Sequence, residues 1–222
     1  MKKRRKKDLL LVSSIAAVLT LIAALLLPGV MQYAADAKEQ KDMKWSEEAE
    51  LSDINKDYYC DLVIPGTDIR FPVVKGEDNL KYLHTSFDGK ENKLGSIFMD
   101  YRCGGSNEPH TIIYGHDAKD YDGNLLMFGK LRNYLEEDFI NEHPEIDLIN
   151  EKEVKRFQLF AVKVTDTEDE AYDLDFDEEY SFRDFANLMD APYGTEEILT
   201  LSTCLGSEDD MRLLIQGAII NE

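Results

Sequence analysis

The chain has 222 residues, 25 of them basic and 45 acidic, and its formal net charge at pH 7 is −20. This length allows one sizeable domain with a terminal appendage. Residues 2–7 are all basic, so the remainder is even more acidic than the total suggests. Such a surface repels phosphate groups, and the composition therefore excludes nucleic acid as a partner.

Residues 9–27 form a predominantly apolar run without a charged side chain, of about the length that spans a bilayer. The basic cluster precedes this run, so the positive-inside rule places the N-terminus in the cytoplasm and the rest outside the cell. A cleaved signal peptide is the alternative, because Ala35-Asp36-Ala37 offers a cleavage pattern. That pattern lies well beyond the end of the run, and the run is longer than a usual signal-peptide core. We therefore expect a single-pass membrane protein with a basic tip and transmembrane helix (1–30), a juxtamembrane stalk with an N-terminal helix (31–56) and a folded domain (57–222).

From Tyr58 onward, short apolar runs alternate with turns. These runs predict strands at 61–64, 69–74, 96–99, 111–114, 146–149, 157–164, 198–204 and 211–220. Helical spacing of apolar residues predicts short helices at 77–82, 127–139 and 181–189. Many short strands with few short helices favour a mainly β fold, a β-barrel or sandwich, over a βαβ fold.

The strand expected at 198–204 ends in a thiol. By period-two alternation one face carries Ile198, Thr200, Ser202 and Cys204, and the other carries Leu199, Leu201 and Thr203. A thiol at the end of a strand, beside small hydroxyl residues, is placed where a substrate can reach it. The competing interpretation is a small buried hydrophobe, which is the most frequent role of a lone cysteine.

The last strand is almost entirely apolar but opens with Arg212. A guanidinium cannot lose its charge, so beside a buried strand it needs an anion or a developing oxyanion. The loop 205–211 is short enough for a hairpin that brings Arg212 beside Cys204. The alternative is a salt bridge between Arg212 and the acidic residues at 208–210.

A reactive thiol needs a partner that sustains thiolate character or delivers a proton. His116 is the best candidate, because it follows Gly115 at the point where an apolar strand ends in a loop. His84 and His110 are expected to be ordinary surface or boundary residues. His143 is expected to be a solvated turn residue.

No metal or cofactor is expected. The sequence contains no Cys-x-x-Cys motif, and its histidines lack ligand spacing, so a structural zinc site is not predicted. The acidic tract 166–179 lacks the glycine and glutamate of an EF-hand loop and is interpreted as a solvated negative loop. Three cysteines outside the cell leave at least one unpaired, and whether Cys60 and Cys103 form a bridge stays open.

Several motifs resemble those of one family. The pentad Thr200-Leu201-Ser202-Thr203-Cys204, with Arg212 opening the next strand and Tyr114-Gly115-His116 upstream, resembles the sortases, the membrane-anchored cysteine transpeptidases of Gram-positive bacteria. The stretches GSIFMDYR (95–102), MFG (127–129), Asp138-Phe139 and His143-Pro144 resemble class B within that family. The resemblance covers most of the chain, from the anchor to the last strand.

The resemblance implies an eight-stranded sortase β-barrel in which Cys204 is the nucleophile, His116 the proton donor and Arg212 the group that holds the substrate carbonyl. It also implies cleavage of a surface protein after the Thr of a C-terminal sorting signal of the Pro-x-Thr type. The acyl group would then pass to an amine of a peptidoglycan precursor. Residues expected to bind the sorting peptide are Asn79, Leu83, Tyr114, Tyr172, Ser202 and Thr203.

Three alternatives remain at this stage. A secreted cysteine protease or hydrolase would use the same residues with water as the acceptor. A pilus-polymerising sortase would use a lysine of another pilin. A non-enzymatic extracellular binding domain would bury Cys204 as a structural residue.

Overall fold

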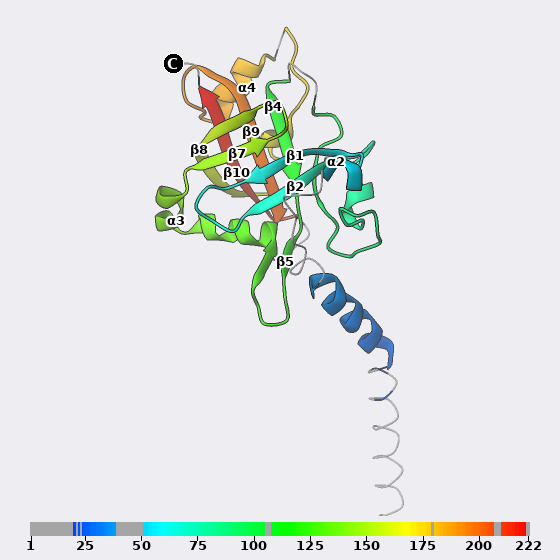
Figure 1. The fold of residues 1–222 in the computed structure, drawn as a ribbon. Helices are drawn as coiled ribbons and strands as arrows, with labels where there is room; N and C mark the ends of the chain where they lie inside the picture. Colours follow the sequence, from blue (N-terminus) through cyan, green and yellow to red (C-terminus); the bar gives the residue numbers. More distant parts are fainter. Residues whose placement is uncertain are drawn as a thin grey trace, which may run out of the picture.

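The computed structural model describes residues 20, 22, 24–38, 51–104, 108–178, 180–206 and 210–220 (Figure 1). The basic tip and most of the expected transmembrane run lie outside these residues. Within the described part of the chain, no helix is long and apolar enough to cross a membrane.

Eight strands close into a mixed barrel in the order β1–β2–β3–β4–β9–β10–β8–β7 (Figure 1). They are β1 Tyr58–Val63, β2 Arg70–Lys75, β3 Ile97–Met99, β4 His110–Tyr114, β7 Glu145–Ile149, β8 Val154–Thr165, β9 Thr195–Cys204 and β10 Arg212–Ile220. The pairs β2–β3 and β4–β9 are parallel, and the other neighbouring strands are antiparallel. The prediction of an eight-stranded β-barrel is confirmed.

Short elements surround the barrel. They are α2 Leu51–Ile54, the 3₁₀ turn η1 Lys81–Leu83, η2 Phe128–Leu135, α3 Glu137–Glu142, η3 Glu170–Tyr172, α4 Phe182–Leu188, and a two-stranded sheet of β5 Asp117–Lys119 and β6 Leu125–Met127. The helix predicted at 181–189 is confirmed as α4, and Ser181 and Asp184 form a capping box at its start.

Two helix predictions were wrong in detail. The helix expected at 127–139 is interrupted at Glu136, whose backbone is extended and separates the 3₁₀ segment η2 from α3. The segment expected as a helix at 77–82 is not helical except where its end overlaps the 3₁₀ turn η1, which begins at Lys81. There the carboxylate of Asp78 accepts hydrogen bonds from the backbone N–H groups of Leu80 and Lys81, which an Asx-type turn provides in place of a helical turn.

The two faces of β9 pack in different hydrophobic clusters. Leu199 and Leu201 lie in the barrel core together with Leu213 and Ile215 of β10. Ile198 faces outward and packs with residues of α4, including Phe185. The alternation predicted from the sequence is therefore confirmed, and the face that ends in Cys204 is the outer face of the barrel.

Residues 24–38 form a helix that contacts the folded domain. The hydroxyl of Tyr33 donates to the carbonyl of Lys119 on β5 at 2.8 Å, and the buried carboxylate of Asp36 accepts from the backbone N–H of Lys93 at 3.0 Å. Ala37 is buried in the same core cluster as the barrel strands. Part of the segment expected as a stalk is therefore packed against the folded domain.

Truncation of a side chain on the inner face of β9 should lower the free energy of unfolding more than truncation of an exposed side chain on β8. Leu201 is fully buried, so Leu201→Ala is expected to lower the free energy of unfolding by about 2–5 kcal/mol through lost burial and a residual cavity. Val164 on β8 is 45% exposed, and Val164→Ala should change it by less than about 0.5 kcal/mol. Urea unfolding of the two variants measures the contrast, and equal effects would contradict the assignment of the two environments.

Candidate active site

Strand register brings the three candidate catalytic residues to one edge of the barrel. Cys204 and Arg212 are directly paired across the antiparallel strands β9 and β10. Tyr114 pairs with Ser202 across the parallel strands β4 and β9. His116 follows Tyr114 by two residues, just beyond the end of β4. The carboxyl ends of β4 and β9 and the start of β10 therefore meet at one place.

Gly115 allows β4 and β9 to run together up to this edge. Its N–H donates to the carbonyl of Ser202 at 3.2 Å, and its carbonyl accepts from the hydroxyl of Thr203 at 2.8 Å. A Cβ at this position would lie 2.4 Å from Cδ1 of Ile97 and 2.7 Å from Cγ of Phe128. Only glycine fits here without displacing the strand that delivers His116.

The imidazole of His116 is hydrogen-bonded to the last residue of η1. Its Nε2 lies 2.9 Å from the carbonyl oxygen of Leu83, and because a carbonyl only accepts, Nε2 carries a hydrogen. The proton that His116 can exchange is therefore the one on Nδ1. The ring also stacks on the exposed imidazole of His84, with 6.2 Å between ring centroids.

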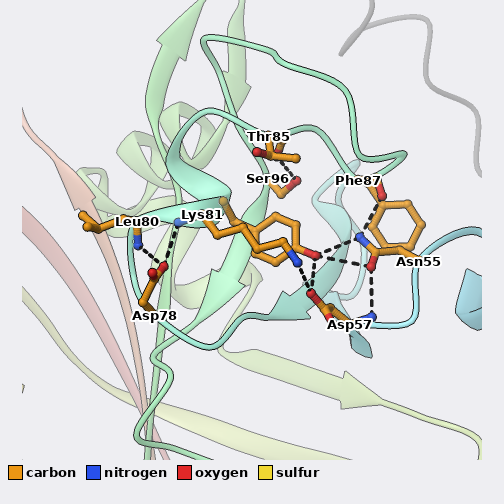
Figure 2. A network of polar contacts seen from close by, with 9 residues as sticks. Asn55, Asp57, Asp78, Leu80, Lys81, Thr85, Phe87 and Ser96 are labelled. Atoms are coloured by element: carbon orange, nitrogen blue, oxygen red, sulfur yellow. Dashed lines mark hydrogen bonds and ion pairs between the residues drawn. The ribbon is translucent and has the colours of Figure 1, made fainter.

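A polar network fixes the segment that carries Leu83 and His84. The phenol of Tyr82 donates to the carboxylate of Asp57 at 2.8 Å, and Asp57 also pairs with the ammonium of Lys81. Asn55 donates to the carbonyl of Phe87 at 2.8 Å. Figure 2 shows these contacts converging on the 78–96 segment. The hydrogen bond from Lys81 and that from Tyr82 outweigh burial and lower the pKa of Asp57, so the network stays charged at neutral pH.

A groove of about 400 Å³ opens above the three residues. It is lined by Asn79, Leu83, Phe98, Tyr114, Gly115, His116, Thr167, Tyr172, Ser202, Thr203, Cys204 and Arg212. Every residue that the sequence predicted for the site is among them, and Phe98 and Thr167 are additions. Cys204 is only half-buried, so its thiol is not sealed in the interior.

A roomier cavity of about 560 Å³ lies elsewhere, beside the turn between β7 and β8. It contains none of the predicted catalytic side chains. Cys60 lines it, and burial raises the pKa of that thiol to about 12. Cys103 is also a free buried thiol, with a pKa raised by burial to about 11. Neither thiol is a thiolate at neutral pH. The cavity beside the β7–β8 turn is larger than the groove, but it holds no reactive thiol.

Tyr172 closes one side of the groove. Its hydroxyl lies 2.8 Å from Oγ of Ser202, and its ring stacks on that of Tyr114 with 6.5 Å between centroids. Burial raises the pKa of Tyr172, so the phenol remains protonated. The acidic loop before α4, expected to be solvated, thus delivers one aromatic wall of the groove.

His110 is not the surface or boundary residue that the sequence indicated. It is 1% exposed and links the acidic loop to the barrel. Nδ1 lies 2.8 Å from the carbonyl of Asp173 and Nε2 lies 2.9 Å from Oγ1 of Thr200. The carbonyl only accepts, so Nδ1 donates and Nε2 accepts from Thr200, whose hydroxyl accepts in turn from Gln216 at 3.2 Å.

Asp100 is a further residue of the site that was not predicted. This residue is fully buried, just after β3, and accepts hydrogen bonds from Asn79 and Tyr114 in the groove. A carboxylate directly after a buried apolar strand, two residues before an arginine, was the available signal. Its partners come from distant segments, and the sequence alone does not identify them.

The groove brings together a thiol, an imidazole and a guanidinium among its lining side chains. Acyl transfer from an amide needs these three functions: a strong nucleophile, a proton for the leaving amine and a donor for the developing oxyanion.

Comparisons with known proteins agree with this chemistry. Residues 62–220 match the family model described as the sortase domain. Sortase B of Listeria monocytogenes is 34% identical over 187 residues, covering 78% of this chain and 74% of the relative. The Staphylococcus aureus sortase B–substrate complex superposes with a TM-score of 0.67 at 28% identity, covering 86% of this chain and 92% of that one. A crystal structure of sortase B complexed with triglycine gives 0.66 at 31% identity, covering 77% and 84%.

The chain therefore belongs to the sortase family of cysteine transpeptidases. Within the family it is a homologue of the class B enzymes, and it shares their eight-stranded barrel.

The buried imidazole of His110 should make stability depend on pH. Burial lowers its pKa from 6.5 to about 4, so below pH 6.5 the unfolded chain binds a proton that the folded protein does not. A tenfold change in proton affinity corresponds to about 1.4 kcal/mol, so this residue alone should lower the free energy of unfolding by roughly 3 kcal/mol between pH 7 and pH 4. His110→Gln keeps a donor and an acceptor but cannot titrate. Urea unfolding should show a shallower fall in this variant; equal slopes would contradict the account.

The close contacts at Gly115 generate a second prediction. Gly115→Ala should lower the free energy of unfolding by about 1–3 kcal/mol, because the added methyl group meets Ile97 and Phe128. It should also reduce reaction of the thiol with substrate, because His116 is displaced with the strand. Gly29→Ala is the matched control, since no atom lies within 4 Å of its Cβ position. Thermal unfolding and peptide turnover of both variants test this, and an unaffected Gly115→Ala protein would refute it.

Proposed function

We propose that this chain cleaves a surface protein after the Thr of a C-terminal Pro-x-Thr-type sorting signal and transfers it to an amine of a peptidoglycan precursor. The observation that supports the proposal is the pairing of Cys204 with Arg212 across β9 and β10, together with the presence of His116 in the groove that both residues line. Membership of the sortase family supports it.

In the first half-reaction the sulfur of Cys204 attacks the carbonyl carbon of the Thr residue. The carbonyl π electrons move to oxygen, and the guanidinium of Arg212 donates hydrogen bonds to the resulting oxyanion. His116 gives its Nδ1 proton to the departing amine as the C–N bond breaks. A thioester between Thr and Cys204 remains, together with neutral imidazole.

In the second half-reaction an amine replaces the sulfur. The amine attacks the thioester carbonyl and loses a proton to His116, and the C–S bond breaks to restore the thiolate. The product is a new amide. The hydrogen bond from Nε2 to the carbonyl of Leu83 keeps the imidazole in one orientation through both steps.

The groove offers room for the peptide, and its walls combine apolar and polar groups. Asn79, Leu83, Tyr114, Tyr172 and Ser202 are proposed to contact the sorting signal, and Thr203 to support the strand beneath it. Sortase B has been crystallised with a substrate and with triglycine, which supports a peptide donor and an amine acceptor for this chain also.

The proposed location is the outer surface of the cell membrane. The basic cluster at residues 2–7 and the apolar run at 9–27 support a single-pass anchor with a cytoplasmic N-terminus. A domain tethered in this way does not need long-range attraction to wall polymers, which its negative charge would not provide.

A peptide library with a Pro-x-Thr core, incubated with the full chain and candidate amines including triglycine, tests the proposal. Mass spectrometry should find cleavage after Thr and a new amide to the amine.

Arg212→Ala should lower kcat/KM by about 10²–10³-fold while the circular dichroism spectrum is unchanged, because one oxyanion donor is typically worth that factor. Cys204→Ala should abolish both turnover and the thioacyl adduct.

The other outcomes separate the alternatives. Release of free acid without any amide, at all amine concentrations, would favour a hydrolase. Amide formation only with a pilin lysine would favour pilus assembly. Resistance of Cys204 to alkylation, with no cleavage of any peptide, would leave a binding domain and overturn the proposal.

A further inference from the structure

Asp100 lies beneath the groove and is saturated with hydrogen-bond donors. Its side chain is fully buried. Arg102 approaches with Nε 3.0 Å from Oδ1 and Nη2 3.0 Å from Oδ2, in the bidentate geometry of a strong ion pair. Oδ2 also accepts from Nδ2 of Asn79 at 2.9 Å and from the phenol of Tyr114 at 3.0 Å. One buried charge thus connects two residues that line the groove.

These contacts determine how Asn79 presents its amide. A carboxylate only accepts, so the atom of Asn79 that faces Asp100 is the NH₂ group. The backbone N–H of Tyr101 only donates, and it lies 3.0 Å from Oδ1 of Asn79. Both ends of the amide are therefore assigned, with the oxygen toward the backbone of Tyr101 and the NH₂ group toward Asp100. One Nδ2 hydrogen has no acceptor among the described residues, so Asn79 offers the groove a donor.

Tyr114 is oriented by the same charge. Its hydroxyl hydrogen is directed to Asp100, so the phenol oxygen is left to accept from a ligand. Its ring packs between Phe98 and Tyr172, at 5.4 and 6.5 Å between centroids. The wall made by Asn79 and Tyr114 therefore presents one N–H donor beside one oxygen acceptor, which complements the C=O and N–H groups of an extended peptide.

We propose that Asp100 is a positioning residue for substrate binding, which sets the donor and acceptor pattern of the groove through Asn79 and Tyr114. The proposal rests on the peptide transpeptidation proposed above and adds a residue that does not itself line the groove. Burial opposes ionisation of Asp100, but the hydrogen bonds from Arg102, Asn79 and Tyr114 outweigh it and lower its pKa. The carboxylate is consequently charged, and accepts only, across the pH range in which the enzyme would work.

Asp147 provides a matched control. It is also buried, at 5% exposure, and is also held by a bidentate arginine, with Nε and Nη2 of Arg156 each 2.8 Å from one of its oxygens. It stands on β7 and does not line the groove. Replacement of either aspartate by asparagine removes a buried charge from an arginine and exchanges one acceptor oxygen for an NH₂ donor, but only Asp100→Asn makes this exchange in a group that accepts from groove residues.

The test compares Asp100→Asn, Asp147→Asn and the wild-type full chain on one peptide that the wild type cleaves. Asp100→Asn should raise KM by about tenfold or more and leave kcat within about twofold, because the substituted amide no longer orients Asn79 and Tyr114. Asp147→Asn should leave KM unchanged. In the Asn79→Ala background, Asp100→Asn should add less than half of its single-variant effect on KM, because one of the two groove residues through which it acts is already removed.

The outcomes separate this inference from the proposed function. Equal KM changes in the two asparagine variants, or full additivity with Asn79→Ala, would overturn the role of Asp100 while transpeptidation stands. Absence of cleavage by the wild type would overturn the proposed function itself. If Asp100→Asn fails to fold, Arg102→Lys removes the bidentate contact and keeps the charge. Its KM should then rise by a smaller factor and again be less than additive with Asn79→Ala; an unchanged KM would refute the proposal.

Discussion

The pairing of β9 with a parallel strand on one side and an antiparallel strand on the other is the constraint on which the site depends. A parallel neighbour brings its carboxyl end to the same edge as that of β9, and an antiparallel neighbour starts there. Cys204 and Arg212 are thus paired, and β4, which leads to His116, ends beside them although it is distant in sequence. Hydrogen bonds of the backbone, rather than contacts among the reactive groups, establish this arrangement.

The groove is built on the outer face of the barrel, so the apolar core need not accommodate reactive polar groups. Strands and loops both line it, and two of the loops are attached by a buried polar residue whose hydrogen bonds are satisfied. His110 ties the acidic loop to β9 through Thr200, and Asp100 ties the segment around Asn79 to β3 and β4. Loop positions therefore follow from the same strands that position the thiol.

Local patterns in the sequence predicted most of the barrel, whereas the peptide-binding residues of the groove were expected from the resemblance to the sortases. Alternation along β9 and the short loop to Arg212 are properties of adjacent residues, and both predictions hold. The β5–β6 hairpin was not predicted, because two of the three residues of β5 are charged and give no apolar run. His110 and Asp100 were missed for another reason. Their burial is set by partners far away in the chain, and a polar side chain with an unknown partner is by default expected at the surface.

The most direct test of the account is a crystal structure of the full chain with a sorting peptide joined covalently to the sulfur of Cys204. The account predicts that the guanidinium of Arg212 lies within hydrogen-bonding distance of the peptide carbonyl oxygen at the point of attachment. It also predicts that Nδ1 of His116 faces the position of the leaving nitrogen. A guanidinium turned away to neighbouring carboxylates, or an imidazole out of reach of the adduct, would contradict it.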